Sequence, residues 1–295
     1  MTMTCCRFAG RALRCGARPA VLAALILAGC ATPPQRLDAE AASLGFTRSV
    51  VAGTGFRHVV FANGRPATGG SLHVYLEGDG TPYVDRWTVA ADPTPRQPLM
   101  LRLMALDPGP AVYLGRPCYA GLAADPPCTP FDWTLGRFGD GVVDSLARVV
   151  ERLQAESGAT SLALFGHSGG GTLAVLLGAR LPDVRRIVTL AGNLDIDAWA
   201  DLHDYTRLTG SLNPVLGGPL PAEIEQQHFA GAGDRVVPPG LIETAATRLG
   251  SPGVIVVSDV THTSGWGRRW PAILAGHGNG TNPPEVSGTR SASPP

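Results

Sequence analysis

The sequence predicts an α/β protein whose central sheet is mainly parallel. Short runs of β-forming residues alternate with segments of helical periodicity, which is the order in which parallel strands and their crossover helices occur. Several of these segments contain continuous apolar runs, as expected of strands that are buried on both faces. The chain has 295 residues, 44% of them hydrophobic, which is enough for one large domain with a substantial core.

Seven strands are predicted from these runs. The first two, at residues 57–64 and 71–78, are separated by the turn-forming NGRPATGG, so we expect them to pair as antiparallel strands at one edge of the sheet. The other five should form the parallel part. These runs lie at residues 111–115, 161–166, 185–192, 227–234 and 253–259.

Three helices are predicted between the strands. In residues 137–158 apolar side chains recur every three to four positions, and Gly158 is placed to end the helix. Residues 171–181 form the second helix, and residues 238–250 the third, which starts on prolines. Residues 193–225 fit neither period, and we expect an irregular insertion over one end of the sheet.

The first 29 residues have the pattern of a secretory signal peptide, with arginines followed by an apolar stretch too short to span a membrane stably. The stretch ends in LAGC, residues 27–30, which resembles the lipobox of bacterial lipoproteins. This resemblance implies that Cys30 carries a diacylglycerol group and becomes the first residue of the mature chain. An ordinary signal peptide with a chance cysteine is the alternative.

The domain organisation follows from this assignment. Residues 30–48 are expected to be a membrane-proximal spacer, and residues 49–276 the folded domain. Residues 277–295 are rich in Gly, Pro, Ser and Thr, and we expect a disordered tail. The predicted location is the bacterial cell envelope, on its periplasmic face. Ala31 lacks the aspartate associated with inner-membrane retention in some lipoproteins, which favours the outer membrane.

Processing would leave two cysteines besides the lipidated one. Cys118 and Cys128 are then expected to form a disulfide, because the compartment is oxidising. A zinc site is not predicted, since two cysteines at this spacing lack the second pair or the histidines that zinc needs.

Residues 166–170 read GHSGG and satisfy the pattern G-x-S-x-G. Ser168 lies between a predicted strand and a predicted helix, as the strained turn of a nucleophile elbow requires. A tight glycine turn without chemistry is the steric alternative. Nucleotide binding is a weaker one, because the stretch lacks the lysine of a phosphate-binding loop.

Over residues 50–275 the chain resembles the α/β-hydrolase fold family. The resemblance implies a mostly parallel central sheet flanked by helices, with a small irregular insertion after the sixth strand, and a catalytic serine, acid and histidine in that chain order. Asp234 follows a predicted strand, and His262 comes just past the last one. The implied catalytic residues are therefore Ser168, Asp234 and His262.

The chemistry requires all three groups. A serine hydroxyl is a weak nucleophile at neutral pH, so a histidine must take its proton and return it to the leaving group. A buried carboxylate holds that histidine in the right tautomer. Asp195 and Asp197 follow the preceding strand and remain open as alternative acids.

The resemblance also implies an oxyanion hole made by two backbone amides. One belongs to Gly169, after the nucleophile, and the other to Asp79 in YLEGDG, residues 75–80. Gly78 and Gly80 are expected to let this loop approach the substrate.

Acidic side chains in this loop create an electrostatic problem. Glu77 and Asp79 must be turned away or paired, with Arg86 or Arg137 as candidate partners, because a free negative charge would oppose the developing oxyanion. His167 is expected to line the substrate pocket or to be structural. Trp87, Trp133, Trp199 and Trp266 are expected to build the core or the pocket walls.

These features predict a serine hydrolase that acts on a small-molecule or lipid-like ester through an acyl-enzyme. No metal or organic cofactor is predicted. A thioesterase or amidase with the same residues is one alternative, and a non-catalytic envelope binding protein that keeps the fold is another. Basic and acidic residues balance at 24 each, which argues against nucleic acid as a partner.

Overall fold

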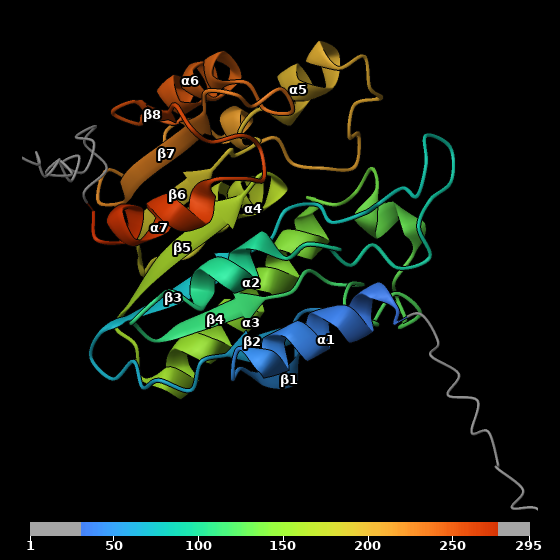
Figure 1. Ribbon diagram of the computed structural model, residues 1–295, viewed down its shortest axis with the longest axis vertical. Helices are drawn as coiled ribbons and strands as arrows, with labels where there is room; N and C mark the ends of the chain where they lie inside the picture. The colour runs from blue at the N-terminus through green and yellow to red at the C-terminus, as the bar shows by residue number, and fades with distance from the viewer. Residues whose placement is uncertain (1–30, 277–295) are drawn as a thin grey trace, which may run out of the picture. The chain divides into compact units, whose positions relative to one another are not determined.

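The computed structural model describes residues 31–276 and is organised around one eight-stranded sheet (Figure 1). The strand order across the sheet is β1-β2-β4-β3-β5-β6-β7-β8. The strands are β1 (Thr47–Ala52), β2 (Arg57–Ala62), β3 (Ser71–Leu76), β4 (Ala111–Leu114), β5 (Ser161–His167), β6 (Val184–Leu190), β7 (Glu225–Gly231) and β8 (Val254–Val257). From β4 to β8 all neighbouring strands in this order are parallel, so the mainly parallel sheet is confirmed.

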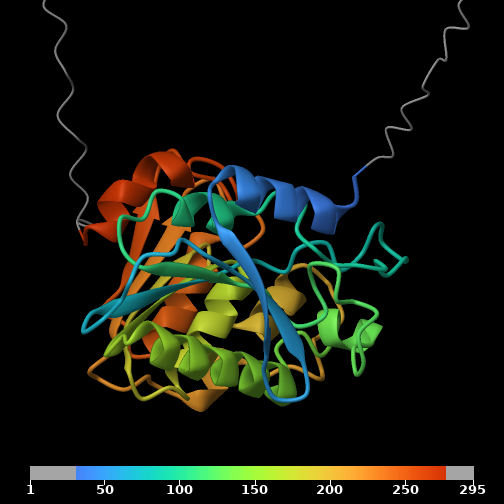
Figure 2. The ribbon, with the colours of Figure 1, turned by 90° about the horizontal axis from the view of Figure 1, so that it is seen from below.

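Helices cover both faces of the sheet. The α-helices are α1 (Pro33–Ser43), α2 (Leu99–Met104), α3 (Asp140–Ser157), α4 (Gly169–Gly178), α5 (Ile196–Leu202), α6 (Pro239–Arg248) and α7 (Trp266–Leu274), and the short 3-10 helices are η1 (Pro130–Trp133) and η2 (Pro214–Gly217). Helices α3, α4 and α6 pack on one face, while α1, α2 and α7 pack on the other (Figure 2). Successive residues of a strand point to opposite faces, so Val74 and Tyr75 of β3 enter different cores.

The antiparallel edge is built differently from the prediction. Strands β2 and β3 do not pair with each other. Instead β2 pairs antiparallel with β1 and β4, and β4 then lies parallel to β3. The long connection of residues 77–110, which contains α2, returns the chain beside β3 as a parallel crossover. A tight turn between two runs therefore did not determine their pairing.

The folded unit begins earlier than residue 49. Helix α1 lies inside the predicted spacer, and its Leu37 and Ala41 are 2% and 0% exposed in the core formed with α2 and α7. The backbone amide of Thr32 donates to the side chain of Gln35 and helps to begin this helix. The predicted signal peptide, Cys30 and the predicted tail lie outside the described residues. No helix within 31–276 is long and apolar enough to cross a membrane.

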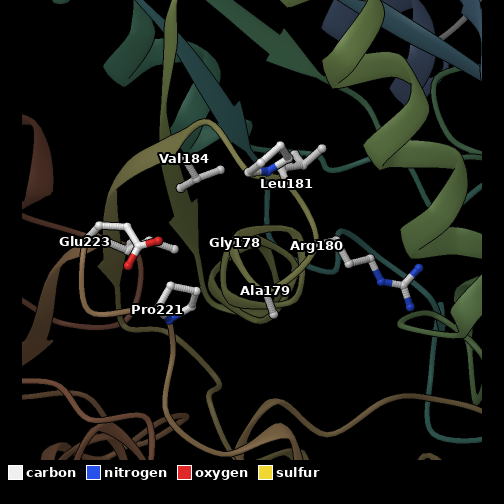
Figure 3. Close-up of a pocket in the computed structure, with 9 residues that line it drawn as sticks. Gly178, Ala179, Arg180, Leu181, Val184, Pro221 and Glu223 are labelled. Carbon is white, nitrogen blue, oxygen red and sulfur yellow. The ribbon is translucent and has the colours of Figure 1, made fainter.

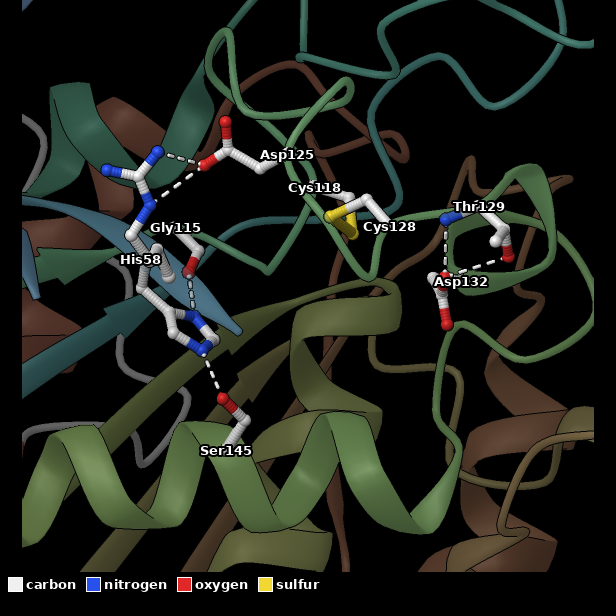
Figure 4. The surroundings of a disulfide bond; sticks show 9 residues. His58, Gly115, Cys118, Asp125, Cys128, Thr129, Asp132 and Ser145 are labelled. Atoms are coloured by element: carbon white, nitrogen blue, oxygen red, sulfur yellow. Dashed lines mark hydrogen bonds and ion pairs between the residues drawn. A yellow bond between two sulfur atoms is a disulfide. The ribbon is translucent and has the colours of Figure 1, made fainter. Parts of the chain in front are cut away.

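The predicted disulfide is present. Cys118 and Cys128 are joined, with their Cα atoms 5.6 Å apart, in the long loop between β4 and α3 (Figure 4). The Cys118 side chain is buried and packs with Tyr119 and Trp133. The two cysteines are ten positions apart in the sequence, so the crosslink closes a short loop that has a small core of its own.

Removing this crosslink should lower the free energy of unfolding. In the chain-entropy model a loop of this length contributes about 3 kcal/mol, so Cys118→Ser should cost that amount in urea unfolding without reductant. Cys128→Ser should cost the same, and the double variant little more, because one crosslink is lost in each case. A wild-type unfolding curve that reductant does not move would contradict this expectation.

Three buried histidines should make stability depend on pH. Burial lowers the pKa of His58, His167 and His228 to about 4, from 6.5. Between these two values the unfolded chain binds more protons than the folded one, so stability is full above 6.5 and falls as the pH drops toward 4. Burial raises the pKa of Glu77 to about 7, which acts in the opposite direction.

With three histidines against one carboxyl, the free energy of unfolding should fall overall between pH 6.5 and 4. Chemical denaturation at a series of pH values measures this. Stability that stays level or rises toward pH 4 would show that these side chains are not buried as described.

Candidate active site

Ser168 occupies a strained turn at the carboxyl end of β5. Its φ of 52° and ψ of −122° lie outside the regions that a serine normally adopts, and α4 begins at the next residue. The amide of Ser168 donates to the carbonyl of Leu190 over 3.0 Å, and its carbonyl accepts from the amides of Gly171 and Asn193. These bonds to the end of β6 and to α4 hold the turn in place.

The glycines around Ser168 are required by close packing of backbone. A Cβ on Gly170 would lie 2.1 Å from the carbonyl oxygen of Leu76 in β3, and one on Gly166 would lie 2.2 Å from the carbonyl oxygen of Gly170. Any larger residue would push α4 away from the sheet. The steric explanation of GHSGG therefore holds, but it does not exclude a chemical role for the serine that the glycines raise above the strands.

The structure brings Ser168, His262 and Asp234 together. His262 Nε2 lies 3.1 Å from Ser168 Oγ, and His262 Nδ1 lies 2.9 Å from Asp234 Oδ2. The Asp234 side chain is fully buried, and its Oδ1 accepts from the amides of Val236 and Val237. With Nδ1 donating to this carboxylate, Nε2 is the ring nitrogen that can accept the serine proton.

The alternative acids lie elsewhere. Asp195 caps α5 by accepting from the amide of Ala198, and its carboxylate pairs with Arg248 at 3.0 Å. Asp197 accepts from the side-chain amide of Asn213. Among these carboxylates only Asp234 contacts the ring of His262.

His167 joins the two loops that meet at Ser168. It is 5% exposed, its Nε2 donates to the carbonyl of His262 over 2.8 Å, and the two imidazole rings are 4.9 Å apart. A Cβ on Gly78 would lie 3.2 Å from His167 Nδ1. The structure thus places His167 between the loop that carries Gly78 and the loop that carries His262, with little surface open to a ligand.

The loop with Gly78, Asp79 and Gly80 lies over the start of α4. A Cβ on Gly169 would lie 1.9 Å from Asp79 Oδ1, so the Asp79 carboxylate covers the Cα of the residue after Ser168. Gly80 follows with a φ of 67° and turns the chain outward. The amide of Gly169 is in the first turn of α4, where no helical carbonyl can accept it.

Two arginines neutralise the Asp79 carboxylate. Arg137 Nη1 is 2.7 Å from Oδ2, and Arg116 Nη2 is 2.8 Å from Oδ1. Burial alone would raise the pKa of Asp79, but the guanidinium groups of Arg137 and Arg116 hold it below its usual range. Arg86 is not a partner, because it stacks on the ring of Trp87.

Arg116 was not predicted from the sequence. It directly follows the predicted strand at 111–115, at the edge of the sheet where the loops of parallel strands gather, and this position was the available signal. Glu77, the other acidic residue of the loop, is buried and accepts from the amides of Gly78 and Met100. Its charge is therefore turned away from Ser168 into the backbone.

Replacing Asp79 should damage both stability and activity. Asp79→Ala leaves Arg116 and Arg137 buried without their carboxylate, which typically costs about 3 kcal/mol or more. The loop would also lose its hold on α4, so kcat for any ester that is hydrolysed should fall. Asp79→Asn keeps the shape and should retain more of the stability. Equal unfolding midpoints for wild type and Asp79→Ala would contradict this view of the ion pairs.

Comparisons with known proteins agree with the observed fold. A family model described as the alpha/beta hydrolase fold matches residues 119–222. An esterase from Pyrococcus furiosus superposes with a TM-score of 0.54 at 13% identity, covering 79% of this chain and 91% of the esterase. The chain has the α/β-hydrolase fold.

Other α/β hydrolases are similar in the same way. A membrane phospholipase A, described as a bacterial virulence factor, superposes with a TM-score of 0.52 at 17% identity. The matched region covers 84% of this chain and 93% of the phospholipase chain. An acylaminoacyl peptidase from Pyrococcus horikoshii superposes with a TM-score of 0.54 at 11% identity. The matched region covers 78% of this chain and 41% of the peptidase chain. A comparison with curated protein sequences finds no match.

A second serine and histidine pair in this fold has a different setting. His58 Nε2 lies 2.7 Å from Ser145 Oγ, and His58 Nδ1 donates to the carbonyl of Gly115 (Figure 4). Both side chains are fully buried, and Ser145 lies within α3. Without a carboxylate on the ring or any access to solvent, this pair links β2, β4 and α3 and cannot bind a substrate.

A cavity of about 110 Å³ lies away from the site. It is formed by the carboxyl end of α4, the start of β6 and residues 221–224 (Figure 3). Ser168 is at the opposite end of α4, and Arg180 at the cavity is paired with Asp140 and Asp144. In the described part of the chain, no three His, Cys, Asp or Glu side chains are grouped closely enough to hold a metal ion.

Proposed function

We propose that this protein is a serine hydrolase that cleaves esters through an acyl-enzyme on Ser168. The observation that carries the proposal is the continuous hydrogen-bonded series from Asp234 through His262 to Ser168 Oγ. In the first step Oγ attacks the ester carbonyl carbon, His262 Nε2 takes the hydroxyl proton, and the same proton passes to the leaving alkoxide. Water then repeats the sequence on the acyl-enzyme, and Asp234 stabilises the imidazolium that forms in each half.

The oxyanion of each tetrahedral intermediate would be held by the amides of Gly169 and Asp79. The Gly169 amide lies at the first turn of α4, whose helix dipole also favours negative charge. Pairing of the Asp79 carboxylate with Arg116 and Arg137 removes the charge that would oppose it. These features support an oxyanion hole, for which Gly78 and Gly80 supply the close approach of the loop.

Esters are proposed over thioesters and amides as the substrate class. The similar folds include an esterase and a phospholipase A, but also a peptidase, so the fold itself is compatible with several leaving groups. An alkoxide leaves the tetrahedral intermediate more readily than an unprotonated amine nitrogen does, which favours esters over amides, and the site places one histidine as the proton donor to it. The esterase among the similar folds is the reason to propose esters over thioesters. Activity against matched ester, thioester and amide analogues with one acyl group would rank the three classes.

A fluorophosphonate probe tests the proposal directly. It should label the folded protein, and peptide mass spectrometry should locate the label on Ser168. Ser145→Ala is a matched control, because Ser145 also contacts a histidine but is fully buried, and this variant should still be labelled. A folded protein that takes no label at several probe concentrations would favour the alternative of a non-catalytic binding protein.

We further propose that the chain is anchored to the bacterial envelope, on the periplasmic face of the outer membrane, through a lipid on Cys30. The LAGC stretch and the basic and apolar residues before it support this. Cells fed a labelled fatty acid should label the wild type, and Cys30→Ser should abolish the label. Cys15→Ser, inside the proposed signal peptide, should leave it unchanged. A wild type that is unlabelled and released as a free protein would contradict the anchor.

A further inference from the structure

A hairpin that follows the loop over Gly169 carries exposed large apolar side chains. It spans residues 81–93 and begins directly after Gly80, at the end of the loop that covers Gly169. Its exposed apolar residues are Tyr83 (40% exposed), Val84 (52%), Trp87 (82%) and Val89 (37%). The expectation that Trp87 builds the core or a pocket wall is therefore wrong, whereas Trp133 and Trp266 are buried as expected.

Hydrogen bonds give the hairpin a defined shape. At its base the amide of Thr81 donates to the carbonyl of Pro93 over 2.8 Å, and near its tip the amide of Val84 donates to the carbonyl of Thr88 over 2.9 Å. The Asp85 carboxylate accepts from the amide of Thr88 and closes the turn. These polar groups are satisfied within the hairpin, so its tip can approach an apolar phase at little cost to its backbone.

The start of α1 lies on the same side of the protein as this hairpin. Pro34 is in contact range of Gly121, two residues beyond Tyr119, whose hydroxyl donates to the carbonyl of Asp79. In Figures 1 and 2 the first turn of α1 and the teal hairpin both lie on the right, the side to which β5 points in Figure 1. Ser168 directly follows β5, at the carboxyl end of that strand.

The chain enters the described structure here, and only two residues separate Cys30 from Pro33. Since a residue spans at most about 3.6 Å, a lipid on Cys30 would keep this side of the protein within roughly 10 Å of the bilayer surface. The exposed apolar tip and the proposed anchor thus both indicate the lipid bilayer as the partner of this surface.

We propose that the hairpin of residues 81–93 dips its apolar tip into the headgroup region of the lipid bilayer, so that Ser168 takes ester substrates from that bilayer. The inference rests on the proposed hydrolase function and on the proposed anchor. Tryptophan and tyrosine favour the boundary between headgroups and acyl chains. Arg86, stacked on the Trp87 ring, adds a cation that can pair with lipid phosphate.

Quenching of tryptophan fluorescence by brominated acyl chains tests this contact. The full chain with Cys30→Ser would be bound to vesicles of phosphatidylcholine and phosphatidylglycerol, with or without bromine on the acyl chains. Residues 1–30 contain no tryptophan, Trp133, Trp266 and Trp270 are buried, and Trp199 is partly buried. The part of the quenching that disappears when Trp87 is replaced therefore reports on Trp87. We expect quenching in this protein, and loss of most of it when Trp87→Phe is added.

Two further variants test whether membrane contact is specific to the hairpin or made by any exposed apolar side chain. Val84→Ser combined with Val89→Ser should reduce quenching and slow hydrolysis of a vesicle-embedded ester severalfold, while hydrolysis of a soluble short-chain ester stays unchanged. Leu106→Ser is the control, because Leu106 is 49% exposed but precedes β4, at the end of the sheet opposite Ser168. It should alter neither quenching nor hydrolysis.

The outcomes distinguish this inference from the proposed function. Vesicle-bound protein whose Trp87 is not quenched would overturn the membrane contact even if soluble esters are hydrolysed. Self-association that the hairpin variants abolish, without quenching, would assign the tip to a second copy of this chain and also overturn it. Quenching without any ester hydrolysis would leave the membrane contact standing and overturn the hydrolase.

Discussion

Ser168→Ala should lower kcat by about 10⁶-fold while leaving the fold intact. Alanine keeps the backbone of the strained turn and removes only Oγ, the atom that lies 3.1 Å from His262 Nε2. Fluorophosphonate labelling should disappear together with turnover. Circular dichroism and the unfolding midpoint should match those of the wild type, because the contacts of the turn are made by its main chain.

The matched control for this variant is Ser145→Ala. It removes a hydroxyl from the other serine and histidine pair, and we expect a loss of stability with kcat preserved. A Ser168→Ala protein that keeps its activity would overturn the role of the turn as a nucleophile elbow. The glycines would then serve packing alone.

Asp234→Asn should lower kcat by about 10⁴-fold. The amide keeps the size of the side chain, but its nitrogen can no longer accept from His262 Nδ1, so the ring is no longer held with Nε2 free for the serine proton. Steady-state kinetics with a soluble ester would measure this, and KM should change little because Asp234 is buried behind the histidine. Asp195→Asn is the control, since Asp195 pairs with Arg248 and caps α5.

Combining Asp234→Asn with Ser168→Ala should cost little more than Ser168→Ala alone. Residues that act as one unit show such non-additive losses. Losses that multiply instead would indicate separate structural roles for the two residues.

Much of the fold was predictable because it depends on local pattern. Strand β5 is largely apolar, β6 and β7 each end in a short buried run, and α3 combines helical spacing with Gly158, whose φ of 69° ends it. In β1, by contrast, five of the six residues are exposed, so it carries no apolar signal. Helix α2 is only six residues long, too short for its periodicity to be recognised.

Some residues of the candidate site could likewise be predicted from the sequence, and others could not. Ser168, Asp234 and His262 could be chosen from the sequence because each lies at or just past the end of a predicted strand, and the loops after parallel strands meet at one edge of a sheet. Arg137 was one of the two candidate partners of Asp79, but the sequence could not decide between it and Arg86 and did not indicate Arg116. Arg116 and Arg137 are 37 and 58 positions from Asp79, and the loop between β4 and α3 brings them to it. Arg86, closer in the sequence, is held outside by the hairpin that carries it.

What the sequence alone determined is therefore the order and type of the central elements and the residues at their ends, since both follow from hydrophobic periodicity and glycine placement. Only the tertiary structure decided that β4 separates β2 from β3, that α1 belongs to the core and that Trp87 is exposed. Pairing and exposure depend on contacts between residues far apart in the chain. No pattern within a short stretch of sequence contains that information.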